Sequence, residues 1–255
     1  MTMPVKAWFE FEGKVLRARL NRPPANILDE EMVTALDGVL AEHLDNTSLS
    51  AVMIDADGSN FSYGASVEEH LPQQCASMLH RFHDLLLRIV ESDLPIIAAV
   101  KGRCFGGGLE LAMAAHLCFV AADANLAQPE MKLGVFAPAA SCILPKLIGP
   151  TRAYDLLVSG RTITGTEACQ FGIANAAADD PEQAALTYIR EHIIPKSSSS
   201  VRFATVAARG DFARTIRPEL KRLEAIYLEN LMKTHDAVEG LQAFLQKREA
   251  QWMHR

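Results

Sequence analysis

The sequence predicts an α/β fold, because short apolar runs alternate along its first half with segments whose apolar residues recur at helical spacing. Over residues 15–20, apolar side chains alternate with Arg17 and Arg19, as expected of a half-exposed strand. Three short apolar runs are typical of more fully buried strands: residues 51–54, 95–100 and 117–120. Two segments between the strands place Leu, Met, Val and Ile at helical spacing: residues 29–44 and 76–90. This alternation indicates crossover units.

The second half of the chain is mostly helical after Gly149 and Pro150. Residues 164–167 read Thr-Gly-Thr-Glu, a capping box that opens a short helix. Apolar residues recur at helical spacing between residues 218 and 248, so we expect a C-terminal helix over that range.

A run of four serines follows Lys196 and predicts a boundary in the chain. The 255 residues are enough for one large domain with a substantial core. We therefore expect a core domain over residues 1–195 and a C-terminal helical region over residues 196–255.

Composition excludes several classes of protein. A net charge of −6 argues against a general nucleic-acid-binding surface, and no apolar stretch is long enough to span a membrane. The first residues carry Trp8, Glu10 and Glu12 instead of a basic and then apolar leader, so we expect a cytoplasmic protein.

Cysteine and histidine spacing predicts no metal site. The five cysteines are scattered without a metal-ligand pattern, which favours buried free thiols. His80 and His83 lack an acidic partner in the local sequence, so solvated or capping roles are expected for them.

A triple glycine, Gly106-Gly107-Gly108, follows the apolar run of residues 95–100 and begins a helix. Glycine lets the backbone approach a ligand closely, and the first N–H groups of a helix have no partner within that helix. The turn can therefore donate to developing negative charge. Glu110 lies in the first turn of this helix and Glu130 follows a proline in a loop, so two carboxylates can flank one ligand and perform acid and base chemistry.

These residues resemble the crotonase, or enoyl-CoA hydratase/isomerase, superfamily over nearly the whole chain. The glycine-rich turn, the glutamate-bearing helix and the later Gln128-Pro129-Glu130 segment occur in the family's order. Further matches lie at residues 21–26, 61–65 and 157–161 and at Ala168 and Gly172. The resemblance implies an α/β crotonase-like spiral of repeated ββα units. It also implies a C-terminal helical region that packs between subunits of a trimer or a dimer of trimers.

The resemblance implies that the substrate is an acyl-CoA thioester, with coenzyme A as part of the substrate and no separate cofactor. The backbone N–H groups of Ala65 and Gly107 match the oxyanion hole, which stabilises the thioester enolate. Glu110 and Glu130 match the two catalytic glutamates of the hydratases. Because both are present, we expect hydration in preference to isomerisation, since adding water requires an oriented oxygen as well as a proton relay.

The segment after Gly134 departs from the usual glycine-rich loop of straight-chain hydratases. Pro138, Ala140 and Ser141 stiffen it and add volume where the family's acyl pocket lies. With residues 61–70 and 235–241, this segment resembles the branch that hydrates a conjugated cyclic dienoyl-CoA thioester in anaerobic benzoyl-CoA degradation. The implied substrate-binding residues are Ala25, Tyr63, Gly64, Gly106, Phe136, Pro138 and Ser141.

Basic residues at the pocket mouth are expected to meet the coenzyme A phosphates, and the candidates are Arg22, Lys247 and Arg248. Three alternatives stay open. A general 2-enoyl-CoA hydratase of fatty-acid β-oxidation would use the same catalytic residues with a different acyl pocket. A nucleic-acid-binding relative is disfavoured by the acidic charge balance, and a thioester hydrolase or ring-cleaving relative would use the same oxyanion hole for another nucleophile.

Overall fold

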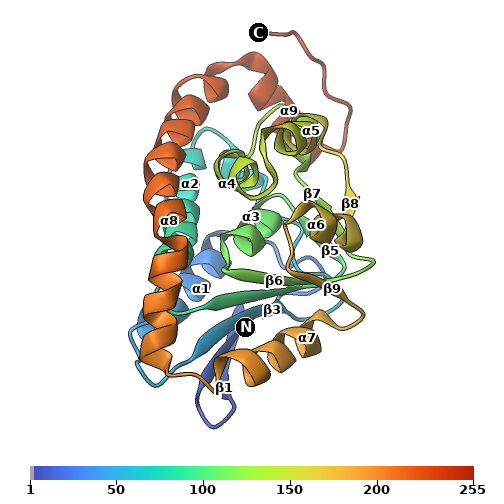
Figure 1. The fold of residues 1–255 in the computed structure, drawn as a ribbon. Coiled ribbons are helices and arrows are strands. Elements are labelled where there is room, and N and C mark those ends of the chain that lie inside the picture. The colour runs from blue at the N-terminus through green and yellow to red at the C-terminus, as the bar shows by residue number, and fades with distance from the viewer. Residues whose placement is uncertain (1–2) are drawn as a thin grey trace.

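A computed structural model describes residues 3–255. Its main sheet has six strands and runs through the middle of the lower half of the view in Figure 1. The strand order is β1-β2-β3-β4-β6-β9; β1 and β2 are antiparallel and every other neighbouring pair is parallel. The strands are β1 (Val5–Glu10), β2 (Val15–Leu20), β3 (Ala51–Ala56), β4 (Ile96–Val100), β6 (Leu117–Ala121) and β9 (Ala176–Ala178). The buried runs expected at residues 51–54, 95–100 and 117–120 are confirmed as β3, β4 and β6.

A second sheet has three short strands in the order β5-β7-β8: β5 (Arg103–Phe105), β7 (Asn125–Ala127) and β8 (Ile163–Thr164). It lies beyond the edge of the large sheet, next to α6 (Figure 1). Strand β5 leads directly into the glycine turn, so this small sheet positions the candidate site.

Helices cover both faces of the large sheet (Figure 1). On one face, α7 and the π-helix η3 pack on a cluster that includes Met53, Ile97 and Phe119. On the other face, α1 to α4 pack on the main core. The longer helices are α1 (Glu30–His43), α2 (Cys75–Glu91), α3 (Gly107–Ala114), α4 (Pro138–Ile148), α5 (Pro150–Ser159), α6 (Gly165–Phe171), α7 (Pro181–Tyr188), α8 (Ser198–Glu229) and α9 (His235–Leu245). The short helices are η1 (Glu68–His70), η2 (Pro129–Leu133), η3 (Ile189–Ile193) and η4 (Leu231–Lys233).

Strand β2 is not half-exposed, and that expectation is wrong. Arg17 is only 8% exposed, because α7 packs on the same sheet and brings Glu182 to it. Its guanidinium group pairs with Asp55 and Glu182, and Arg19 pairs with the same two carboxylates. The alternation of apolar and charged residues therefore reflects a buried ion-pair network instead of a solvated face.

The C-terminal helix expected over residues 218–248 begins earlier, at Ser198, and it is interrupted. Helix α8 runs through Pro218 and ends at Glu229, and α9 follows after a break capped by Thr234. None of residues 198–215 is buried, so they lack the apolar pattern that predicts a helix. Proline favours a helix start, but here the packing of α8 on α2 and α4 outweighs one missing N–H donor.

Several local predictions are confirmed. The segments expected at residues 29–44 and 76–90 are α1 and α2, and the capping box at Thr164 and Glu167 opens α6. All five cysteines are free thiols; Cys169 is half-buried and the other four are buried. Within residues 3–255, no helix has the length and apolar character needed to cross a membrane.

Candidate functional site

The glycine turn joins β5 to α3. The strand expected before it is β4, but β5 lies between β4 and the turn, which corrects the predicted connection. Gly106 precedes α3 with a φ of 50°, and a β-carbon at this position would lie 2.5 Å from Oε1 of Glu130. Gly106 is therefore required both for its backbone conformation and for the close approach of Glu130.

Two backbone N–H groups face the same space beside this turn. A β-carbon added at Gly107 would lie only 3.1 Å from the backbone nitrogen of Ala65, so the two segments approach closely. Gly64, with a φ of 106°, donates its N–H to Oγ of Ser62 at 3.1 Å, which holds the segment in place. In the part of the chain that the structure describes, neither the Ala65 nor the Gly107 N–H has an acceptor. They are available to bind an oxyanion.

Glu110 is held by the starts of two helices. It lies in the first turn of α3, is 5% exposed, and its Oε1 accepts the N–H of Ala140 at 2.7 Å. The segment predicted as a stiffened loop is in fact the first turn of α4, with Pro138 at its start. Burial raises the pKa of Glu110, while the Ala140 N–H and the charge of His83 oppose that rise.

Glu130 lies on the short 3-10 helix η2 and not in an irregular loop as predicted. Burial of its carboxyl group, and secondly the neighbouring Glu110, raise the pKa of Glu130 to about 8. With its side-chain amide oriented so that the nitrogen faces Glu130, Gln128 donates to both carboxyl oxygens at 3.1 Å. Gln128 is 2% exposed, so this contact is shielded from solvent.

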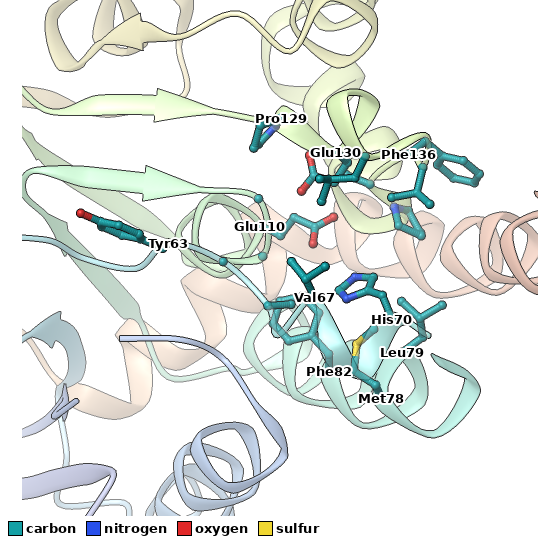
Figure 2. Close-up of a pocket in the computed structure, with 18 residues that line it drawn as sticks. Tyr63, Val67, His70, Met78, Leu79, Phe82, Glu110, Pro129, Glu130 and Phe136 are labelled. Carbon is teal, nitrogen blue, oxygen red and sulfur yellow. The ribbon is translucent and has the colours of Figure 1, made fainter. Parts of the chain in front are cut away.

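The two carboxyl groups face one inner cavity of about 80 Å³ (Figure 2). Figure 2 shows Glu110 and Glu130 above a wall formed by η1, α2 and the residue before η1. The wall is mainly apolar: Val67, His70, Met78, Leu79 and Phe82. Sequence reasoning missed these residues, because the apolar spacing of α2 fits a packed core equally well.

A larger outer groove of about 830 Å³ adjoins the inner cavity. The two share five lining residues: Tyr63, Ala65, Val67, Pro129 and Leu133. Phe244 and Leu245 of α9, together with Arg248, line the groove but not the inner cavity. The arrangement provides a small inner cavity that contains the two carboxyl groups and a much wider groove beside it.

The structure brings most of the predicted substrate-binding residues to the cavity. Tyr63, Gly64, Gly106, Phe136 and Pro138 line the inner cavity. Figure 2 shows the Tyr63 ring directed away from the two carboxyl groups, and its hydroxyl accepts a hydrogen bond from Arg103 at 2.8 Å.

Two of the predicted substrate-binding residues line neither cavity. The Ala25 carbonyl accepts the Tyr63 N–H at 2.8 Å, so Ala25 supports the turn from behind. Ser141 lies within the first turn of α4, where its N–H donates to the Ala137 carbonyl at 2.9 Å.

Of the three basic residues, only Arg248 lines the groove. Its guanidinium group forms two hydrogen bonds with the Glu239 carboxylate, at 2.6 and 2.8 Å. Arg22 pairs with Asp29 and Glu31 outside both cavities, and Lys247 also lies outside them.

A distant carboxylate contacts both histidines; the expectation of a solvated or capping role is wrong for His83, whereas the His80 side chain is 59% exposed and remains solvated. Nδ1 of His83 lies 2.5 Å from Oε2 of Glu224, and Nε2 of His80 lies 2.8 Å from Oε1 of the same residue. His83 is 3% exposed, so it is neither solvated nor a cap. Glu224 is on α8, which packs on α2, and the local sequence could not reveal this pairing. Among residues 3–255, no cluster of His, Cys, Asp and Glu has the geometry of a metal site.

Comparisons with known proteins give a consistent result. A family model described as enoyl-CoA hydratase/isomerase matches residues 10–255. A cyclohexa-1,5-dienecarbonyl-CoA hydratase from Thauera aromatica is 52% identical and the match covers 99% of this chain and 98% of that protein. A probable enoyl-CoA hydratase from Bacillus subtilis (strain 168) is 31% identical over 91% of this chain and 93% of that protein. The crystal structure of a putative enoyl-CoA hydratase from Mycobacterium avium paratuberculosis K-10 has a TM-score of 0.87, at 23% identity over 98% of this chain and 99% of that one. The α/β fold predicted from the sequence is confirmed.

Proposed function

This chain belongs to the enoyl-CoA hydratase/isomerase family, and from that premise we propose that it hydrates a conjugated cyclic dienoyl-CoA thioester. The proposed substrate is cyclohexa-1,5-diene-1-carbonyl-CoA, the product is 6-hydroxycyclohex-1-ene-1-carbonyl-CoA, and the process served is anaerobic benzoyl-CoA degradation. The relative that is 52% identical supports this choice, because its name gives the same substrate.

The observation that carries the proposal is the enclosure of two carboxyl groups with two free N–H donors around one small cavity. A thioester carbonyl that accepts from Ala65 and Gly107 would place its reactive carbons toward Glu110 and Glu130. A double-bond shift can use a single carboxyl group as both acid and base. Hydration needs one group to take a proton from the water and a second group to donate a proton to carbon.

We propose different roles for the two carboxyl groups on the basis of their surroundings. Burial raises the pKa of Glu110 as well, but the Ala140 N–H and the neighbouring His83 oppose that rise, so we assign to Glu110 the proton taken from water. The pKa of Glu130 is raised to about 8, so this group is mostly protonated at neutral pH and can donate a proton to carbon. Both transfers occur on one bound thioester, and the enolate charge is held by the N–H pair.

The outer groove is proposed to bind the coenzyme A portion of the substrate. Its volume of about 830 Å³ and its continuity with the inner cavity support this. Arg248 is the candidate for a phosphate contact, in exchange for or in addition to its pairing with Glu239.

A comparison of hydration rates on cyclohexa-1,5-diene-1-carbonyl-CoA and crotonyl-CoA tests the proposal, with product mass read for the gain of one water. Faster turnover of the cyclic diene is expected. Preference for crotonyl-CoA would instead assign a general 2-enoyl-CoA hydratase. No gain of water on either thioester would overturn the hydratase proposal, and release of free thiol would point to a hydrolase.

We also propose that the protein acts in the cytoplasm as a trimer or a dimer of trimers. Exposed apolar side chains on α8 support self-association: Phe203 is 78% exposed and Val206 is 53% exposed. Sedimentation equilibrium should give three or six times the chain mass of 27.9 kDa, and a monomer mass would contradict the assembly without affecting the proposed chemistry.

A further inference from the structure

His70 places a polar atom on the apolar wall of the inner cavity. Its neighbours on that wall are carbon-rich side chains: Val67, which precedes η1, and Met78, Leu79 and Phe82 of α2. Figure 2 shows the imidazole ring on this wall, across the cavity from Glu130. A histidine in such surroundings requires hydrogen-bond partners for both ring nitrogens or a ligand that supplies one.

One ring nitrogen is already used. Nδ1 of His70 lies 2.7 Å from the carbonyl oxygen of Ser66, and because a carbonyl can only accept, Nδ1 carries the proton. Burial lowers the pKa of His70 below its usual range, so the ring is neutral near pH 7. Nε2 therefore carries a lone pair and can only accept a hydrogen bond.

The second nitrogen is open to the cavity. Within residues 3–255, Nε2 of His70 has no hydrogen-bond partner, yet it is not sealed inside the protein as Nε2 of His83 is. The Ser66 carbonyl fixes both the tautomer and the direction of the ring. His70 thus presents one oriented acceptor to whatever occupies the space between Glu110 and Glu130.

We propose that His70 accepts a hydrogen bond from the attacking water and from the hydroxyl group that this water becomes. The inference rests on the proposed hydratase function and deepens it. It makes His70 a specificity residue for hydroxylated acyl-CoA thioesters, the product side of the reaction.

The proton balance of hydration explains why this acceptor is needed. Water gives one proton to Glu110 as its oxygen bonds to a ring carbon, and the displaced π electrons move to the thioester oxygen as an enolate. Glu130 then donates its proton to carbon as the enolate electrons return, and a proton passes from Glu110 to Glu130 to restore both groups. The second O–H of water stays on the oxygen throughout, and against an apolar wall it would lose its partner without His70.

Equilibrium binding to the Glu110→Gln protein, in which turnover is blocked, tests the inference. The probes are cyclohexanecarbonyl-CoA and 2-hydroxycyclohexane-1-carbonyl-CoA, which differ by one hydroxyl on the carbon next to the substituted one. In the Glu110→Gln protein, the additional substitution His70→Leu is expected to weaken binding of the hydroxylated thioester about tenfold, the size expected for one lost buried hydrogen bond. Binding of the unhydroxylated thioester should change by less than about twofold.

Two further variants separate this role from a structural one. His70→Asn can still donate to the Ser66 carbonyl but presents no acceptor at the Nε2 position, so it should show the same selective loss even if His70→Leu does not fold. Met78→Leu alters the same wall without removing a polar atom and should leave the ratio of the two affinities unchanged.

The outcomes are distinct. If the two His70 variants weakened binding of both thioesters equally, or left the ratio of the two affinities unchanged, the proposed role of His70 would be overturned. The hydratase proposal would remain intact. Failure of the Glu110→Gln protein with native His70 to bind either thioester would overturn the proposed function, and the inference with it.

Discussion

Glu110 and Glu130 face one cavity but are held by different kinds of structure. Glu110 is part of a regular helix and receives an N–H from the start of another, so two helix N-termini support its negative charge. Glu130 is on a five-residue 3-10 helix, pressed against Gly106 and reached by the Gln128 amide. The pKa of Glu130 is raised to about 8 by burial and by the neighbouring Glu110.

The comparison shows that one fold places two identical side chains in different surroundings. In the proposed mechanism, the carboxyl group at a helix N-terminus acts as the base, and the one enclosed beside it acts as the acid. The role of each glutamate can therefore be interpreted only together with the helix or turn that holds its side chain.

The largest effect should come from removing either carboxylate. Glu110→Gln and Glu130→Gln should each lower kcat for hydration by roughly 10²–10⁴-fold, the usual contribution of one acid or base group. Folding and thioester binding should persist, because glutamine has nearly the same shape. Circular dichroism and equilibrium binding provide the controls. Near-normal turnover in either variant would show that this residue has no part in the mechanism, and the two glutamates would then not form an acid and base pair.

The substitution Gly106→Ala should displace Glu130 without disturbing the contacts that hold Glu110. The new β-carbon would meet Oε1 of Glu130 at 2.5 Å and would be strained at a φ of 50°, so the acid must move. Displacement of a reacting group by about 1 Å can cost about 10²-fold in rate, and we expect a loss of that order in kcat.

A matched glycine provides the control for Gly106→Ala. Gly38 in α1 has open space around its α-carbon, so Gly38→Ala should leave kcat unchanged and increase stability by about 0.5–1 kcal/mol. An equal loss of activity in both variants would show that the site does not depend on the close approach at Gly106.

The raised pKa of Glu130 predicts a distinctive dependence on pH. Activity needs the protonated acid, so kcat/KM should fall about tenfold per unit as pH rises above about 8. Because the folded-state pKa exceeds the ordinary value of 4.5, the contribution of Glu130 to stability is present below pH 4.5 and is lost as pH rises toward about 8.

Denaturant unfolding checks the sign of this effect. The free energy of unfolding of Glu130→Gln, relative to the unaltered protein, should increase between pH 4.5 and about 8, because glutamine does not ionise. A difference that stays constant or decreases over this range would show that the folded-state pKa of Glu130 is not raised.

The sequence predicted features that depend on neighbours along the chain. The glycine turn, the capping box of α6 and the buried strands have local patterns, and the glutamate pair followed from its order within a family resemblance. The features that it did not predict depend on contacts between distant residues. Glu224 is 141 residues from His83, and Glu182 of α7 is 165 residues from its partner Arg17 in β2.

The first turn of α4 illustrates the same limit at the site itself. Its small residues read as a stiffened loop, because nothing in the local sequence shows that the Ala140 N–H meets Glu110. The wall formed by α2 was indistinguishable from a packed core for the same reason: apolar spacing shows which face is buried, but not whether it faces protein or a cavity.

The smallest effect should come from Gln128, which sharpens the comparison without removing either carboxyl group. Its amide donates to both oxygens of Glu130 and favours the ionised form. In Gln128→Leu the loss of these bonds should raise the pKa of Glu130, so the fall of kcat/KM should move to higher pH by roughly one unit. Gln183→Leu, at an exposed position on α7, should leave the profile unmoved. If the profile of Gln128→Leu moved to lower pH instead, the Gln128 amide would stabilise the protonated form of Glu130. Glu130 would then depend on its neighbours for its protonation state as well as for its position.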